Sequence, residues 1–75
     1  MSSYVKFDLV EQKSRTAVYF VRSVSSDDPL GKVSWYGAWR RYVFFPLEGT
    51  AFDSACLGEV KEFIDGLMKE REEQK

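Results

Sequence analysis

The side chains in this sequence that could do chemistry are one cysteine and a few carboxylates. Cys56 falls in the first turn of a predicted helix, where the helix dipole can lower the pKa of a thiol. No histidine occurs in the 75 residues to act as its base, and Cys56 borders an apolar stripe. A cysteine placed in this way is more often a buried structural residue than a nucleophile. We therefore expect no catalytic residue and no enzyme.

The carboxylates offer no better candidate. Asp27 and Asp28 stand next to each other before a proline, a pattern more typical of turns than of metal ligation. Glu59, Glu62 and Asp65 are expected on the solvated side of a helix. One cysteine without histidine also rules out zinc sites of the Cys/His type and an intramolecular disulfide. The sequence thus predicts no metal site and no cofactor.

An aromatic segment is the most unusual feature. Residues 35–45 hold six of the twelve aromatic residues of the chain, together with Arg40 and Arg41. Such side chains are enriched in the hot spots of protein interfaces, and exposed rings also stack on the bases of single-stranded nucleic acid. A purely structural interpretation competes with both. A small domain can fill a thin core with large rings, while the arginines stack on their neighbours.

The elements that position this segment follow from hydrophobic periodicity and turn residues. Strands are expected at about 4–11, 16–24, 32–36 and 40–45. The stretch up to Pro29 should be the longest loop, because proline cannot donate a ladder hydrogen bond and the chain should leave the sheet there.

A C-terminal helix is expected at about 54–71, with residues 72–75 as a frayed tail. Asp53 is a good N-cap, and Phe52 with Leu57 could form a hydrophobic staple. An apolar stripe then recurs at helical spacing, flanked by Cys56 and Phe63: Leu57, Val60, Ile64, Leu67 and Met68. The predicted fold is α+β, a single domain over 1–75 in which an antiparallel β-meander of three to four strands packs on one C-terminal α-helix.

The pairing of the two aromatic strands decides which rings face the helix. A two-residue turn at Gly37-Ala38, with Gly37 at positive φ, pairs Tyr36 with Trp39. One face then carries Val33, Trp35, Arg40, Tyr42 and Phe44, and the other carries Lys32, Ser34, Tyr36, Trp39, Arg41, Val43 and Phe45. A longer turn would change this sorting. One helix covers only one face of a small sheet, so we expect it over Val33, Trp35 and Phe44.

The second face would then be open, and we expect it to be the binding surface. Its candidate residues are Lys32, Tyr36, Trp39, Arg41 and Phe45. The expected partner is a protein, which includes a second copy of the chain. The glycines at 58 and 66 lie on one helix face, which is either simply exposed or approached by another subunit.

Nucleic acid is the alternative partner. The formal net charge is −1, and residues 1–50 carry seven basic against five acidic residues. This excess is small for a dedicated nucleic-acid binder, so single-stranded DNA or RNA ranks behind protein. No apolar run reaches the length of a signal peptide core or a membrane span, so we expect a cytoplasmic protein without membrane contact.

A family resemblance rests on the spaced aromatic pattern. Its residues are Leu30 to Tyr36, Trp39 to Tyr42, Phe44 to Pro46, and then Thr50, Phe52, Cys56, Leu57 and Phe63. The pattern, a WYxxWRxYxFFP segment followed by a helix, resembles small uncharacterised proteins encoded by bacteriophages and prophages. The resemblance implies a phage-derived accessory protein in the host cytoplasm that acts by contacting a host or phage component, and it brings no activity or catalytic residue with it.

Overall fold

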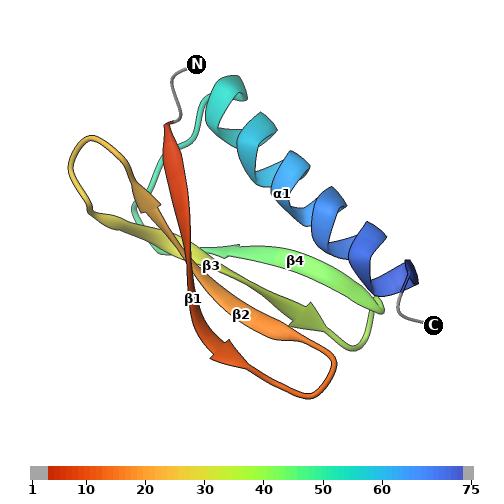
Figure 1. The fold of residues 1–75 in the computed structure, drawn as a ribbon. Coiled ribbons are helices and arrows are strands. Elements are labelled where there is room, and N and C mark those ends of the chain that lie inside the picture. The colour runs from red at the N-terminus through yellow and green to blue at the C-terminus, as the bar shows by residue number, and fades with distance from the viewer. Residues whose placement is uncertain (1–3, 74–75) are drawn as a thin grey trace.

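The computed structural model describes residues 4–73 and shows a four-stranded antiparallel sheet with one helix on one of its faces (Figure 1). The sheet order is β1-β2-β3-β4. The predicted α+β fold, a meander packed on a C-terminal helix, is therefore confirmed. The elements are β1 (Val5–Gln12), β2 (Ala17–Ser23), β3 (Pro29–Tyr36), β4 (Arg41–Pro46) and α1 (Ser54–Glu73).

The element ends differ from the predicted ones in two places. The chain leaves the sheet at residues 24–28 as predicted, but Pro29 is already the first residue of β3 and pairs with Arg22. A proline is tolerated at the first position of a strand, where the ladder needs no N–H from it. The prediction that the stretch before Pro29 is the longest loop is wrong, because residues 47–53 form a longer connection. Helix α1 continues to Glu73, so residues 72 and 73 are helical; the predicted fraying of 74 and 75 lies outside the described residues.

The start of α1 is capped as the sequence predicts. The N–H of Cys56 donates to Asp53 Oδ1 at 2.9 Å, and the N–H of Leu57 donates to the Asp53 carbonyl at 3.0 Å. The predicted hydrophobic staple is not formed. Phe52 packs edge-on against Phe44 with ring centroids 5.1 Å apart, and Leu57 is half exposed.

The core lies between α1 and one face of the sheet. Val21 and Val33 are completely buried at its centre. Around them the helix contributes a stripe at helical spacing, shifted from the predicted one because Leu57 lies outside it. The helical core residues are Cys56, Val60, Phe63, Ile64, Leu67 and Met68.

Two side chains of α1 tie its ends to the sheet. Glu59 was expected to be solvated, but its carboxylate accepts the N–H of Tyr4 at 2.9 Å. At the other end, the guanidinium of Arg71 lies 4.0 Å from the Trp35 ring centre and donates to the Arg15 carbonyl at 3.1 Å. These contacts fix the helix along the sheet.

The hairpin between β3 and β4 uses a longer turn than predicted. Tyr36 pairs with Arg41, so residues 37–40 form the turn, and the N–H of Trp39 donates to the Tyr36 carbonyl at 3.2 Å. Arg40, rather than Gly37, takes the positive φ, at 55°. The predicted two-residue turn is thus wrong.

Candidate functional site

The longer turn leaves the two faces of the hairpin sorted as the two-residue turn predicted, so the expectation that a longer turn would change the sorting is wrong. In the structure Val33 pairs with Phe44 and Trp35 with Tyr42, whereas the two-residue turn would have paired Val33 with Tyr42. The pairing differs by two residues, and side chains alternate with a period of two, so every strand residue keeps its face. The rings expected to face the helix do so, as the contacts of Trp35 and Phe44 with the core confirm.

The opposite face of the sheet is open. We call six residues the aromatic face: Phe20, Lys32, Tyr36, Trp39, Arg41 and Phe45. All five candidate binding residues from the sequence belong to it, and all six side chains are exposed. The exposed fractions of the four rings are 64% for Trp39, 40% for Phe20 and 38% for both Tyr36 and Phe45. The helix lies on the other side of the sheet (Figure 1).

The rings near the turn support one another edge to face. The ring of Tyr36 lies 5.0 Å from that of Trp39 at 83°, and 6.2 Å from that of Phe45 at 84°. Arg41 pairs with Tyr36 across the two strands. Edge-to-face pairs hold rings in place without covering both of their flat sides. The three rings therefore form a fixed platform beside a cation.

A second group crosses three strands. Phe20 on β2, Lys32 on β3 and Phe45 on β4 stand in register, and the Lys32 ammonium lies 5.6 Å from the Phe45 ring centre. Phe20 and Lys32 also separate two open depressions. One, of about 490 Å³, has apolar walls from Phe45, Pro46 and Leu47 among others; the second, of about 530 Å³, extends toward the β1–β2 hairpin.

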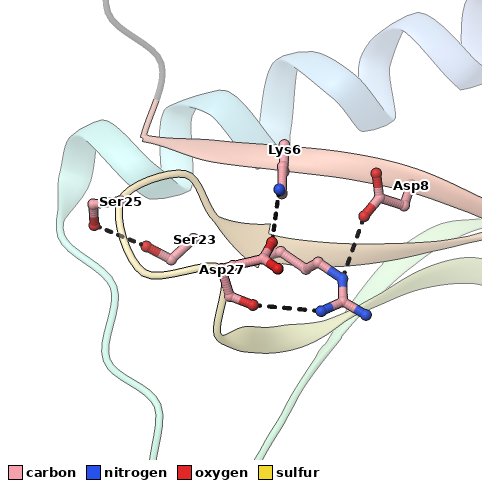
Figure 2. Close-up of polar contacts among 6 residues, drawn as sticks. Lys6, Asp8, Ser23, Ser25 and Asp27 are labelled. Carbon is pink, nitrogen blue, oxygen red and sulfur yellow. Dashed lines mark hydrogen bonds and ion pairs between the residues drawn. The ribbon is translucent and has the colours of Figure 1, made fainter.

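Ion pairs border this face along β1 (Figure 2). Lys6 binds Asp27 with 2.6 Å between Nζ and Oδ1, and Arg22 Nε lies 3.3 Å from Asp8 Oδ2. Arg22 also donates to the main-chain carbonyl of Asp27 at 3.4 Å. These contacts hold the β2–β3 loop onto the sheet and neutralise the cations nearest to β1.

Asp27 is the centre of that border. It has a φ of 61°, a conformation that aspartate tolerates better than most residues, and its N–H donates to the Ser23 carbonyl at 2.8 Å. The hydrogen bond from Lys6 and the charge of that lysine hold the pKa of Asp27 below its usual value. The main-chain carbonyl of Asp28 accepts the Ser23 N–H at 2.9 Å and so closes the loop. Both residues thus act as turn residues.

Cys56 does not have the environment of a nucleophile. Burial raises the pKa of its thiol, and the neighbouring Asp53 carboxylate raises it further. The thiol is therefore protonated at neutral pH, opposite to the effect a helix start alone would have. Among residues 4–71, whose side chains the structure describes, no three His, Cys, Asp or Glu side chains gather where they could hold a metal ion.

Phe20 is the member of this surface that sequence reasoning missed. It lies in a run in which both alternating sets are largely apolar, Ala17, Tyr19 and Val21 on one side and Val18 and Phe20 on the other. Periodicity alone does not say which set faces the helix. Phe20 lies beside the predicted residues because it pairs with Lys32 on the neighbouring strand, and this pairing is known only from the structure.

Comparison with known proteins places the chain near one phage protein. It is 27% identical over 74 residues to an uncharacterised 9.3 kDa protein of Acholeplasma phage L2, covering 96% of this chain and 94% of that protein. No protein-family model matches, and no solved structure matches significantly. None of the helical residues described is part of a segment long and apolar enough to cross a membrane. The chain is thus similar to a small phage protein of unknown function.

Proposed function

We propose that this chain is a non-enzymatic interaction module that binds a macromolecular partner across the aromatic face. The observation that carries the proposal is the exposure of four large rings on the sheet face opposite α1. Contiguous exposed apolar patches of this kind mark interaction sites in soluble proteins, because exposing them without a partner is unfavourable. Tyr, Trp and Arg are also the residues that contribute most to binding energy in protein interfaces.

A protein partner is supported by the shape beside Phe45. The depression there has walls formed by Phe20, Phe45, Pro46 and Leu47, which suits one apolar side chain of a partner. Similarity to a phage protein supports a phage origin, and a phage or host component in the host cytoplasm is the corresponding partner. The segment over residues 35–46 is, on this proposal, the feature that the chain shares with phage-encoded relatives.

The test is affinity capture from extracts of the native host with three forms of the tagged chain. The wild type is compared with Trp39→Ala/Arg41→Ala on the aromatic face and with Leu57→Ala/Lys69→Ala on exposed positions of α1. Each pair removes one apolar side chain and one cation. Recovered proteins are identified by mass spectrometry and recovered nucleic acids by sequencing.

The expected result is a partner recovered with the wild type and the helix variant and lost with the face variant. Circular dichroism and thermal unfolding verify that all three forms are folded. A folded face variant that keeps every partner would show that the aromatic face is not the binding surface.

A further inference from the structure

The two layers of the molecule carry opposite charge. Residues 29–47, which include β3, β4 and their turn, contain Lys32, Arg40 and Arg41 and no acidic residue. Helix α1 contains six acidic residues against three basic ones. An anion is therefore attracted to β3, β4 and their turn and repelled from the helix side. Sequence totals conceal this separation because the chain as a whole has a charge of −1.

The cations on the sheet side are available to a ligand. Lys6 and Arg22 have acidic partners at the β1 border. Among residues whose side chains the structure describes, no ion pair involves Lys32, Arg40 or Arg41. Lys32 and Arg41 belong to the aromatic face, and Arg40 lies next to Trp39 in the turn between β3 and β4.

The spacing of the rings suits an extended chain of flat groups. Phe20 and Phe45 stand on strands on either side of β3, so their Cα atoms are separated by about 10 Å, twice the usual distance between strands. Lys32 lies between them, and Tyr36 with Trp39 forms the next platform along the hairpin. Rings on neighbouring strands with cations between them can stack bases and neutralise the intervening phosphates.

We propose that the macromolecular partner of the aromatic face is single-stranded DNA or RNA rather than a protein, a proposal that rests on the proposed function of that face as a binding surface. The main-chain groups of the inner strands pair within the sheet, so the rings contact bases through their flat sides and read little of their edges. Binding is then tolerant of sequence. A duplex should bind more weakly, because its bases are already stacked on each other and expose no flat side to the rings.

Charge also decides between this ligand and a second copy of the chain. Two copies meeting on β3 and β4 would bring Lys32 and Arg41 of each into one interface, where neither strand has an acidic residue. The carboxylates at the β1 border, Asp8 and Asp27, are already paired with Arg22 and Lys6. Like charges brought together in an interface are unfavourable. Charge thus favours nucleic acid over self-association on this face.

The test uses the full chain and labelled oligothymidylate of about ten nucleotides, within the site sizes known for single-strand binders. Anisotropy of the label measures binding at low salt, and quenching of tryptophan fluorescence reports contact with the exposed Trp39. We expect weaker binding as salt rises, with a log–log slope of about −2 if all three cations contact phosphate. A duplex of the same length and polyglutamate serve as competitors and should displace the oligonucleotide poorly.

Variants assign the binding to the face. Phe45→Ala should weaken binding by about 5- to 150-fold, the loss expected for one stacked base. Trp39→Ala, in the exposed turn, is the second variant in case Phe45→Ala does not fold. Leu57→Ala/Lys69→Ala on the helix should bind as the wild type does.

Three results overturn the inference in distinguishable ways. In the first, the oligonucleotide does not bind at low salt, and a host protein is captured by the wild type but not by the face variant. This result contradicts nucleic-acid binding and supports the proposed function. Equal competition by duplex and polyglutamate shows unspecific charge attraction and also contradicts the proposed single-stranded ligand. Oligonucleotide binding that survives both face variants while the helix variant loses it places the site elsewhere and contradicts both proposals.

Discussion

Arg40 holds the conformation that closes the turn between β3 and β4. Its φ of 55° is in the left-handed region. A residue with a Cβ adopts this conformation at a cost of about 1–2 kcal/mol, whereas glycine adopts it freely. Arg40→Gly should therefore raise the free energy of unfolding by up to about 1 kcal/mol, since the flexibility of glycine in the unfolded chain offsets part of the gain.

The matched control is Arg41→Gly, which also removes one positive charge but lies in β4. It should lower stability by about 0.5–1 kcal/mol, because glycine weakens a strand. Urea unfolding measures both. Equal destabilisation by the two variants would contradict the role assigned to Arg40.

Asp27 and Asp53 make the fold sensitive to acid. The pKa of Asp27 is lowered by its hydrogen bond and ion pair with Lys6, and the pKa of Asp53 by the hydrogen bond from the Cys56 N–H. A carboxyl with a lower pKa in the folded state binds protons more weakly than in the unfolded chain. Its contribution to stability is present above the unfolded pKa, and is lost as pH falls through the folded pKa.

We expect the melting temperature to decrease as pH falls below about 4, the usual pKa of aspartate. The Asp27→Asn/Asp53→Asn double variant should be less stable at neutral pH and lose less stability on acidification. Thermal scans between pH 7 and pH 2 measure both effects. If the melting temperature of the variant falls as steeply with pH as that of the wild type, other carboxylates are responsible for the acid sensitivity.

The pairing of β3 with β4 depends on a glycine. A Cβ at Gly31 would come within 2.5 Å of the Phe45 carbonyl oxygen and 2.9 Å of the Pro46 Cα, both main-chain atoms. Gly31→Ala should cost about 1–3 kcal/mol, the range for overpacking, and disturb the aromatic face beside it.

Gly37→Ala is the control for Gly31, because no atom lies within 4 Å of a Cβ built at Gly37. It should leave stability within about 0.5 kcal/mol of the wild type. Denaturant midpoints compare the two variants. A tolerated alanine at residue 31 would show that β4 does not approach β3 as closely as described.

Helix α1 is attached to the first strand by Glu59. Its carboxylate accepts the N–H groups of Tyr4, at 3.1 and 2.9 Å, and of Val5, at 3.5 Å. Glu59→Ala should lower stability by about 1 kcal/mol through the loss of these bonds, whereas Glu62→Ala, at an exposed position of the same helix, should change it little. Hydrogen exchange at Val5 should accelerate only in the first variant. Unchanged exchange there would contradict the attachment.

Local signals in the sequence were enough to predict the strands, the helix and the side chains on each face of the aromatic hairpin. Periodicity and the Asp53 cap predict the meander and the start of α1 correctly. Face sorting in the aromatic hairpin is also correct, because an error of two residues in the pairing leaves the alternation of side chains intact. The turn itself could not be predicted, since Arg40 rather than a glycine adopts the positive φ.

Features that depend on contacts between residues far apart in the chain could not be predicted from the sequence. Glu59 binds a main chain 55 residues away, and Phe20 joins the site only through its partner strand. Phe52 packs edge-on against Phe44 of β4, a residue eight positions earlier, instead of forming the local staple with Leu57. Whether the aromatic segment was core or surface likewise required knowing which sheet face α1 covers.

Residues 4–73 form two layers, an acidic helix and a sheet that is basic and aromatic along β3 and β4 (Figure 1). This arrangement places the only extensive exposed aromatic surface described in residues 4–73 where an anion is attracted. Stacking and charge then act on the same ligand. The proposed function and the proposed ligand class both rest on this combination of exposed rings and cations on one face, which only the folded molecule has.

The most direct test is an NMR titration of the isotopically labelled chain with oligothymidylate at low salt, following the amide signal of each residue. We expect the changes to concentrate on β2, β3, β4 and the turn at 37–40, centred on Lys32 and Trp39, with the exposed positions of α1 around Asp65 unaffected. Changes confined to α1, or a spectrum that does not change at all, would contradict the assignment of the aromatic face as a surface for single-stranded nucleic acid.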